Sequence, residues 1–233
     1  MARLVASRAL ALLMLVAPAA AMARGKAPRR PLLSVPLLVR VARCGPGAAR
    51  SGPSPKAKGK AARAPTRSDA WVKAHVAAAN TIYQRFGVKL VARIDHFKPS
   101  RCQILTRAHR HAMASYVPAT GVTVLVLPRV RDIDTPTYNL MGVHWRYRGK
   151  DPKLRGRRWV FLTARGRPPV LAHELGHYFG LPHDPKGGNL MAPGPSDPIY
   201  KRAGPKPKPF KPIFVPWQQR TIRRAVQKLL SGK

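Results

Sequence analysis

The chain has 233 residues, with 44 Lys and Arg against 8 Asp and Glu, for a formal net charge of +36 at pH 7. This length accommodates one domain of ordinary size with tails and is sufficient to bury a core. The charge attracts polyanions such as nucleic acid, acidic polysaccharide or anionic membranes. No nucleic-acid-binding module is visible, which favours basic residues spread over the whole surface.

The first 23 residues have the pattern of a secretory signal peptide. Two arginines precede an apolar run over residues 9–17, and small residues at 21–23 form a cleavage pattern. No later segment is apolar enough to cross a bilayer. We therefore expect a secreted or periplasmic protein with no transmembrane segment in the mature chain.

Five strands and three long helices are predicted in the remainder, and residues 35–233 are interpreted as a single domain. The expected elements, in chain order, are a strand at Leu37–Arg43, a helix from Ser68 to Gly87, strands at Val88–Phe97, Gly121–Leu127, Asn139–Arg148 and Arg158–Ala164, and helices at Pro168–Phe179 and Pro216–Leu230. The initial order of strand, helix and strand predicts a right-handed crossover between parallel neighbours.

Three segments have no clear hydrophobic period. Residues 24–34 are predicted to form a flexible basic N-terminus, and residues 45–67, rich in Gly, Pro, Ala and Lys, a flexible insertion. Residues 98–120 contain His109 and His111, two potential metal ligands. Neighbouring arginines and the lack of a nearby acidic or Cys partner favour a surface loop there.

The most informative pattern is HELGHYFGLPH at residues 173–183, which begins in the helix expected at Pro168–Phe179. His173 and His177 are four residues apart and project from the same face of a helix, so two imidazole nitrogens can meet one metal ion. Gly180 can adopt a positive φ and end the helix, which allows His183 to supply a third nitrogen. Three protein ligands leave a position for water, as is typical of catalytic zinc.

Glu174 follows the first of these histidines and is the only glutamate in the chain. It stands where a general base for a zinc-activated water is needed. Because the single Glu occurs at this point, the pattern favours a catalytic Zn²⁺ site over incidental histidines on an amphipathic helix.

The motif, the following Asp184 and the downstream Asn189-Leu190-Met191 resemble the metzincin clan of zinc endopeptidases, whose signature ends in a methionine-containing turn beneath the metal. Asp184 is similar to the adamalysin branch, whereas the short chain is more similar to small secreted bacterial members. The resemblance implies an α/β (α+β) fold with a twisted, mostly parallel five-stranded sheet, one antiparallel edge strand, a backing helix, an active-site helix and a C-terminal helix. It also implies that Met191 forms the hydrophobic floor under the metal.

The resemblance further implies residues that contact substrate. The metzincin edge strand lines the cleft and pairs with the peptide, which makes Gly142, Val143 and His144 candidates, although His144 is also interpretable as a structural histidine. Some metzincins place a Tyr two residues after the turn methionine to stabilise the oxyanion. Pro193 stands at that position here, and Tyr200 is the remaining candidate for this role.

The two cysteines, Cys44 and Cys102, each follow one of two strands predicted to be adjacent and parallel. In an exported protein this arrangement favours a disulfide. A second alternative is that Arg43-Cys44-Gly45 resembles the cysteine switch of matrix metalloproteinase propeptides, in which a thiolate occupies the open zinc position. A third leaves both thiols free.

We expect a secreted zinc-dependent endopeptidase in which Glu174 acts as general base and then general acid on a peptide or protein substrate. The positive charge predicts that acidic substrates associate faster at low salt. The alternative, from a different functional class, is a cationic binder of polyanions or cell-envelope polymers with little or no peptidase activity.

Overall fold

The computed structural model describes residues 31–44, 66–184, 188–193 and 211–232. The expected signal peptide at residues 1–23 lies outside these ranges, as do Tyr200 and most of the expected insertion. At the end of that insertion, the amide and hydroxyl groups of Thr66 both donate to the carbonyl oxygen of Ala42 at 2.8 Å. Among the described residues, no helix is long and apolar enough to span a membrane.

Eight strands and four α-helices are described, with short 3-10 helices at Gln84–Phe86, Met113–Tyr116 and Pro152–Leu154. In chain order they are β1 (Leu33–Ala42), α1 (Asp69–Tyr83), β2 (Val88–Phe97), β3 (Gln103–Ile104), α2 (Arg107–Ala112), β4 (Val122–Leu127), β5 (Arg129–Arg131), β6 (Asn139–Leu140), β7 (Gly142–Arg146), β8 (Arg158–Thr163), α3 (Pro168–Tyr178) and α5 (Pro216–Leu230).

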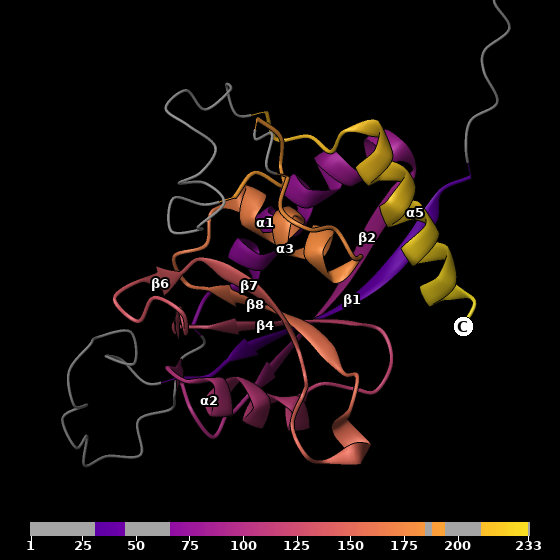
Figure 1. Ribbon diagram of the computed structural model, residues 1–233. Helices are drawn as coiled ribbons and strands as arrows, with labels where there is room; N and C mark the ends of the chain where they lie inside the picture. The colour runs from indigo at the N-terminus through magenta and orange to yellow at the C-terminus, as the bar shows by residue number, and fades with distance from the viewer. Residues whose placement is uncertain (1–30, 45–65, 185–187, 194–210, 233) are drawn as a thin grey trace, which may run out of the picture.

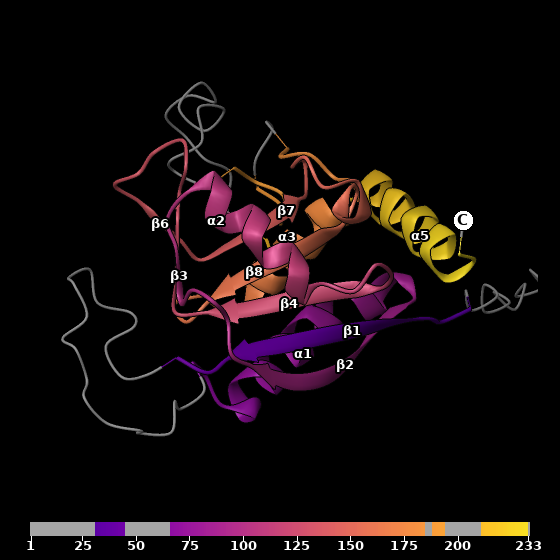
Figure 2. The ribbon, with the colours of Figure 1, turned by 90° about the horizontal axis from the view of Figure 1, so that it is seen from below.

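The main sheet has five strands in the order β2-β1-β4-β8-β7, which Figure 2 shows from below. Every neighbouring pair is parallel except β7 with β8, so β7 is an antiparallel edge strand. The expected fold class is confirmed. The parallel pairing of β1 with β2 also confirms that these two strands are parallel neighbours, as the order strand, helix, strand predicts.

Hydrophobic cores cover both faces of this sheet, with α1, α3 and α5 on one face and α2 on the other (Figure 1). The fully buried strand β4 serves both cores, because successive side chains alternate between faces. Val122, Val124 and Val126 belong to the core beneath α1, α3 and α5. Leu125 and Leu127 belong to the core beneath α2.

The structure corrects three expected boundaries. β1 begins at Leu33, so residues 33 and 34 belong to the sheet and not to the flexible N-terminus expected over residues 24–34. The reason is that β2 pairs with all ten residues of β1, beginning with Leu33 opposite Val88. The strand expected at Asn139–Arg148 divides at Met141. Its first part, β6, pairs with β5 in a separate three-stranded sheet of order β3-β5-β6.

The third correction concerns residues 98–120, expected to be a surface loop around His109 and His111. This segment instead contains β3 and α2, which begins after the N-cap Thr106. Its hydrophobic residues lie close together in the sequence and are interspersed with arginines, so the sequence shows no clear amphipathic period. Met113 and Ala114 are nevertheless buried in the second core.

Cys44 and Cys102 form a disulfide that joins the chain just beyond the ends of β1 and β2, with Cα atoms 5.9 Å apart. This is the arrangement that the sequence favours. Because both sulfur atoms are bonded to each other, Cys44 does not act as a metal-blocking thiolate in this structure.

Candidate metal centre and cleft

Helix α3 begins with Pro168 and Pro169, which cost little in the first turn because amides there have no intrahelical partner. It ends at Tyr178, and Gly180 follows with a φ of +95°. The reversal is closed by a hydrogen bond of 3.0 Å from the Leu181 amide to the Gly176 carbonyl oxygen. The expected glycine turn is therefore present, and it returns the chain towards the helix.

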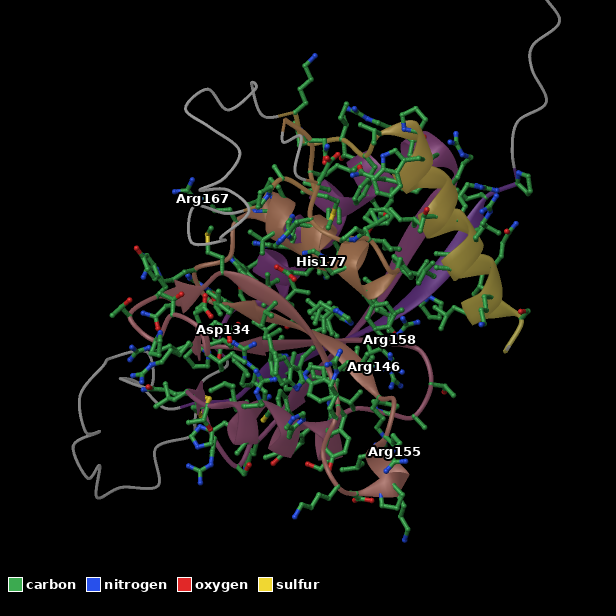
Figure 3. All side chains as sticks on the ribbon, in the orientation of Figure 1. Asp134, Arg146, Arg155, Arg158, Arg167 and His177 are labelled. Atoms are coloured by element: carbon green, nitrogen blue, oxygen red, sulfur yellow. A yellow bond between two sulfur atoms is a disulfide. The ribbon has the colours of Figure 1, made fainter. Side chains whose placement is uncertain are left out.

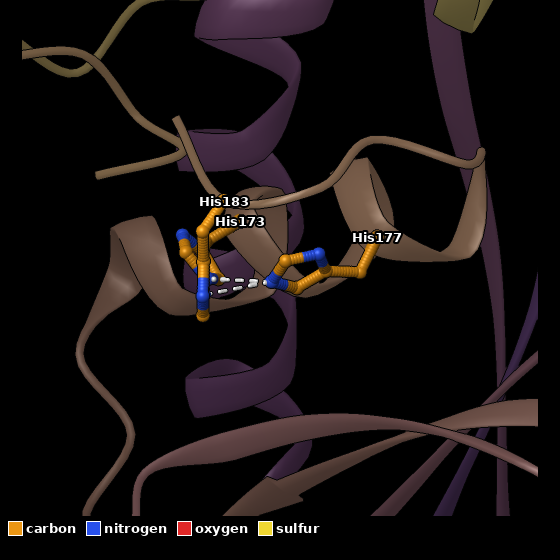
Figure 4. Close-up of side chains that lie close together, drawn as sticks. All are labelled: His173, His177 and His183. Atoms are coloured by element: carbon orange, nitrogen blue, oxygen red, sulfur yellow. Dashed lines mark hydrogen bonds between the residues drawn. The ribbon is translucent and has the colours of Figure 1, made fainter. Parts of the chain in front are cut away.

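This turn brings His173, His177 and His183 together (Figure 4). Nε2 of His177 lies 3.1 Å from Nε2 of His173 and 3.1 Å from Nε2 of His183. Zn–N bonds of about 2.0–2.1 Å in tetrahedral geometry place ligand nitrogens roughly 3.3 Å apart. The three rings therefore have the spacing of ligands to one metal ion, and they form the only such group of three or more among the described residues.

The hydrogen bonds of the rings also fit a metal. Nδ1 of His173 lies 2.6 Å from the carbonyl oxygen of Leu190, and Nδ1 of His177 lies 2.7 Å from that of Leu181. A carbonyl oxygen can only accept, so each neutral ring carries its proton on Nδ1 and has a free lone pair on Nε2. Two lone pairs facing each other at 3.1 Å repel unless a cation lies between them.

Burial keeps these rings neutral. It lowers the pKa of His177 to about 3, assisted by the neighbouring His173, and it lowers the pKa of His173 as well. Because a protonated imidazole cannot bind a metal, depressed pKa values leave both rings available as ligands at neutral pH.

The Asn189-Leu190-Met191 turn lies directly under the helix. Met191 is fully buried, and its Sδ lies 2.6 Å from the point that a β-carbon on Gly176 would occupy. The Met191 carbonyl oxygen accepts from the amide of Asp184 at 2.7 Å. These contacts tie the turn to the residue that follows the third histidine.

Sequence reasoning missed the role of Asn189 within this turn. Its Nδ2 donates to Oδ2 of Asp184 at 2.6 Å, and its Oδ1 accepts from the Met191 amide at 2.8 Å. Nε2 of Gln218, on α5, lies 3.4 Å from the same Oδ1. The one signal in the sequence was the position of Asn189 beside the turn methionine.

Glu174 lies beside the three rings on the side that faces β7. Its Oε2 accepts a hydrogen bond of 2.7 Å from the main-chain amide of His144. Burial raises the pKa of Glu174 to about 8, while the His144 amide and the positive charge of Arg110 act in the opposite direction. A carboxyl group with a pKa near neutrality can both accept and release a proton.

A cleft of about 1250 Å³ contains the three histidines and Glu174. It extends along β7 to the segment between β5 and β6, from which Asp134 projects (Figure 3). The described lining includes three of the eight acidic residues, Asp132, Asp134 and Glu174, but only one of the 44 Lys and Arg, Arg110. The cleft therefore differs in charge from the molecule as a whole.

The three substrate-contact candidates on β7 all border this cleft. The side chain of Val143 packs on the core beneath α2, so it points away from α3. Gly142 and His144 lie on the opposite face of the strand, towards α3. Nε2 of His144 is buried without a hydrogen-bond partner among the described residues, and burial lowers the pKa of this ring to about 4.

Comparison with protein-family models and with curated proteins finds no match. Among solved structures, metalloproteinase-II from Bacteroides fragilis is similar with a TM-score of 0.51 at 10% identity, over 85% of this chain and 55% of that chain. This chain thus spans about half the length of that protein. The similarity shows a shared fold.

Two further structures align with lower scores. Archaemetzincin from Methanopyrus kandleri has a TM-score of 0.46 at 15% identity, over 83% of this chain and 96% of that one. A zinc-dependent peptidase from Methanocorpusculum labreanum has a TM-score of 0.40 at 13% identity, over 80% and 99% of the respective chains.

Proposed function

We propose that this protein is a zinc-dependent endopeptidase of the metzincin type, with one Zn²⁺ held by His173, His177 and His183. The observation that carries the proposal is the convergence of three Nε2 atoms beside a buried glutamate in an open cleft. The neutral, Nδ1-protonated state of His173 and His177 suits zinc, which readily accepts three imidazole ligands and a water.

When bound, zinc supplies a water of lowered pKa and polarises the scissile carbonyl group. Glu174 accepts the proton of the attacking water on its carboxylate. It then delivers this proton to the leaving amine nitrogen, which completes hydrolysis of the peptide bond. The hydrogen bond from the His144 amide to Oε2 orients the Glu174 carboxyl group for this role.

The edge strand β7 offers a surface for an extended peptide. The odd-numbered residues that flank β7, Met141 and Tyr147, form main-chain hydrogen bonds on the side of β8. The Thr163 amide donates to the Met141 carbonyl oxygen at 2.9 Å, and the Tyr147 amide donates to the Arg157 carbonyl oxygen at 2.8 Å. In an antiparallel ladder the intervening residues Gly142 and His144 therefore direct main-chain groups to the free edge. The His144 amide there already donates to Glu174, so a peptide strand would pair with the other main-chain groups, such as the His144 carbonyl oxygen. A substrate strand added here would lie across the cleft beside Glu174.

Two opposing charge effects act on the substrate. The +36 charge of the chain favours approach of acidic proteins at low salt. Inside the cleft, Asp132 and Asp134 favour a peptide with a Lys or Arg side chain near the scissile bond. We propose that the second effect governs which bond is cut, because it acts at contact distance and is screened less by salt.

We also propose export, based on residues 1–23 and on the Cys44–Cys102 disulfide, since disulfides persist in oxidising compartments. Sequencing the N-terminus of the protein recovered from its native host is expected to begin at Arg24. Recovery with Met1 retained would contradict export by cleavage.

The direct test of the proposed activity is reversible metal dependence. Hydrolysis of an unstructured protein is expected to stop after chelation and to return when one equivalent of Zn²⁺ is added. The alternative, a cationic binder of polyanions or envelope polymers, is supported by the net charge. It predicts polyanion binding that falls steeply with salt while no zinc-dependent cleavage is seen.

A further inference from the structure

Gly142 occupies a position on β7 where no side chain fits. A β-carbon placed on it would lie 2.6 Å from Cγ1 of Val170 and 2.8 Å from Cγ of Glu174. It would also lie 3.2 Å from Oε1 of Glu174. Real β-carbons do not approach heavy atoms as closely as the first two distances, so an alanine here must displace a neighbour.

The backbone itself does not require glycine at this point. Gly142 is not among the glycines with positive φ, unlike Gly180 at +95°. It lies within a regular strand, opposite Leu162 of β8. The requirement is therefore spatial, because β7 passes close to the base of the Glu174 side chain.

This close approach and the hydrogen bond from His144 act on the same carboxyl side chain. Gly142 borders its stem, and two residues later the outward-facing amide of His144 donates to Oε2 at 2.7 Å. A strand shifted away from α3 by the width of a methyl group would move that amide out of hydrogen-bond range.

Helix α3 cannot readily move to make room for an added methyl group, because other contacts hold it in place. The hydroxyl group of Tyr83 on α1 donates to the Ala172 carbonyl oxygen at 3.1 Å. On another side, Gly176 lies against Met191. Because α3 is held by these contacts, the parts free to move are β7, as an edge strand, and the side chains of Val170 and Glu174.

We propose that Gly142 is a positioning residue for Glu174. Because Gly142 has no side chain, β7 lies close enough to Glu174 for the His144 amide to donate a hydrogen bond to its carboxyl group. The inference rests on the proposed function only in assigning Glu174 the proton transfer. It differs from a substrate-pairing role for Gly142, because the contact is made within the protein itself, before any substrate binds.

The first test is Gly142→Ala in the zinc-loaded protein. We expect kcat to fall by about 10²-fold, the effect of misplacing a reacting group by about 1 Å. The zinc dissociation constant should stay within about twofold of the parent value, because no zinc ligand is touched. An unchanged kcat, or a loss of activity explained wholly by lost zinc, would overturn the proposal.

Two further variants separate positioning from stability. Gly156→Ala adds a methyl group at a glycine of positive φ with no heavy atom within 4 Å, outside the cleft. It should lower the melting temperature but leave kcat unchanged. Gly142→Ala with Val170→Ala removes one of the two clashes and should recover melting temperature without recovering kcat. Full recovery of kcat would show that Val170, and not Glu174, is the contact that matters.

A measurement without activity keeps the proposal independent of the proposed function. In the metal-free parent, the His144 amide should be protected from hydrogen exchange, although it faces the free edge of the sheet. Gly142→Ala and Glu174→Ala should each abolish this protection. If the parent shows the protection but no zinc-dependent hydrolysis, the proposed function fails while the positioning contact stands. Protection that persists in Gly142→Ala would overturn the contact itself.

Discussion

The carbonyl oxygen of Leu190 lies 2.6 Å from Nδ1 of His173. The histidine is on α3, whereas the carbonyl group belongs to the turn that runs beneath that helix. The orientation of this ring therefore depends on the turn. The side chain of Asn189 stabilises this segment through its hydrogen bonds with Asp184 and with the Met191 amide.

Removal of the Asn189 side chain should weaken metal binding. In Asn189→Ala we expect the zinc dissociation constant to rise by about 10–100-fold, the usual cost of losing a group that orients a metal ligand. Competition with a chromophoric chelator measures it. Asn80→Ala is the matched control, because the side chain of Asn80 exchanges two hydrogen bonds with the main chain of Leu90, outside the site. Equal losses of zinc affinity in the two variants would contradict the assignment.

The raised pKa of Glu174 predicts a pH-dependent stability of the metal-free protein. Burial raises the pKa of this carboxyl group from 4.5 to about 8. Between these values the unfolded chain has lost the proton while the folded chain retains it, so folding becomes less favourable as pH rises. Glu174→Gln has no such proton. The free energy of unfolding of the variant should therefore rise relative to that of the parent between pH 5 and pH 8, and the difference should stay constant above pH 8.

Denaturant unfolding of both metal-free proteins at pH 5, 7 and 9 measures this difference. All other titrating groups are shared by the two proteins, so their contributions cancel in the comparison. A difference in the free energy of unfolding that is the same at all three pH values would contradict the raised pKa.

The disulfide should contribute stability without taking part in the chemistry. Cys44 and Cys102 are 58 residues apart, and closing a loop of this length in the unfolded chain is worth about 4 kcal/mol in the chain-entropy model. Replacing both cysteines by serine should lower the free energy of unfolding by up to that amount and leave zinc content unchanged. Two free thiols in the parent would contradict the disulfide, and higher activity in Cys44→Ser would then support the cysteine switch over two unused thiols.

The acidic lining of the cleft predicts a preference for basic peptides. For a substrate with Lys near the scissile bond, Asp134→Asn should lower kcat/KM by up to about five-fold relative to an uncharged analogue, the value of one exposed ion pair. Asp151→Asn is the control, because Asp151 lies outside the cleft and asparagine can still accept from the Lys153 amide. Faster cleavage of Glu-containing peptides by the parent would contradict this preference.

The sequence was sufficient for the local features of the site. Spacing alone places His173 and His177 on one helix face, and Gly180 predicts the turn that returns His183. Val88–Phe97 and Pro216–Leu230 were predicted with the bounds that the structure has, because each combines a clear apolar pattern with a Gly or Pro at its start. Such signals are local, so they survive without knowledge of the fold.

Contacts between segments far apart in the sequence could not be predicted from local patterns. The hydrogen bond from His144 to Glu174 spans 30 positions, and Gly142 contacts the same side chain from two residues earlier in the chain. Nothing in either local pattern indicates these contacts. The division of the strand expected at Asn139–Arg148 has the same origin, since β6 is defined by its partner β5. For residues 98–120, α2 is too short to show a period, and the buried Met113 and Ala114 lie in the 3-10 helix that follows it.

Comparing Glu174→Gln with the parent, for zinc content and for hydrolysis of an unstructured protein, separates metal binding from proton transfer. We expect one equivalent of Zn²⁺ in both proteins and a fall in kcat/KM of about 10²–10⁴-fold in the variant, the contribution of a positioned general base. A variant that binds zinc and cleaves as fast as the parent would contradict proton transfer by Glu174.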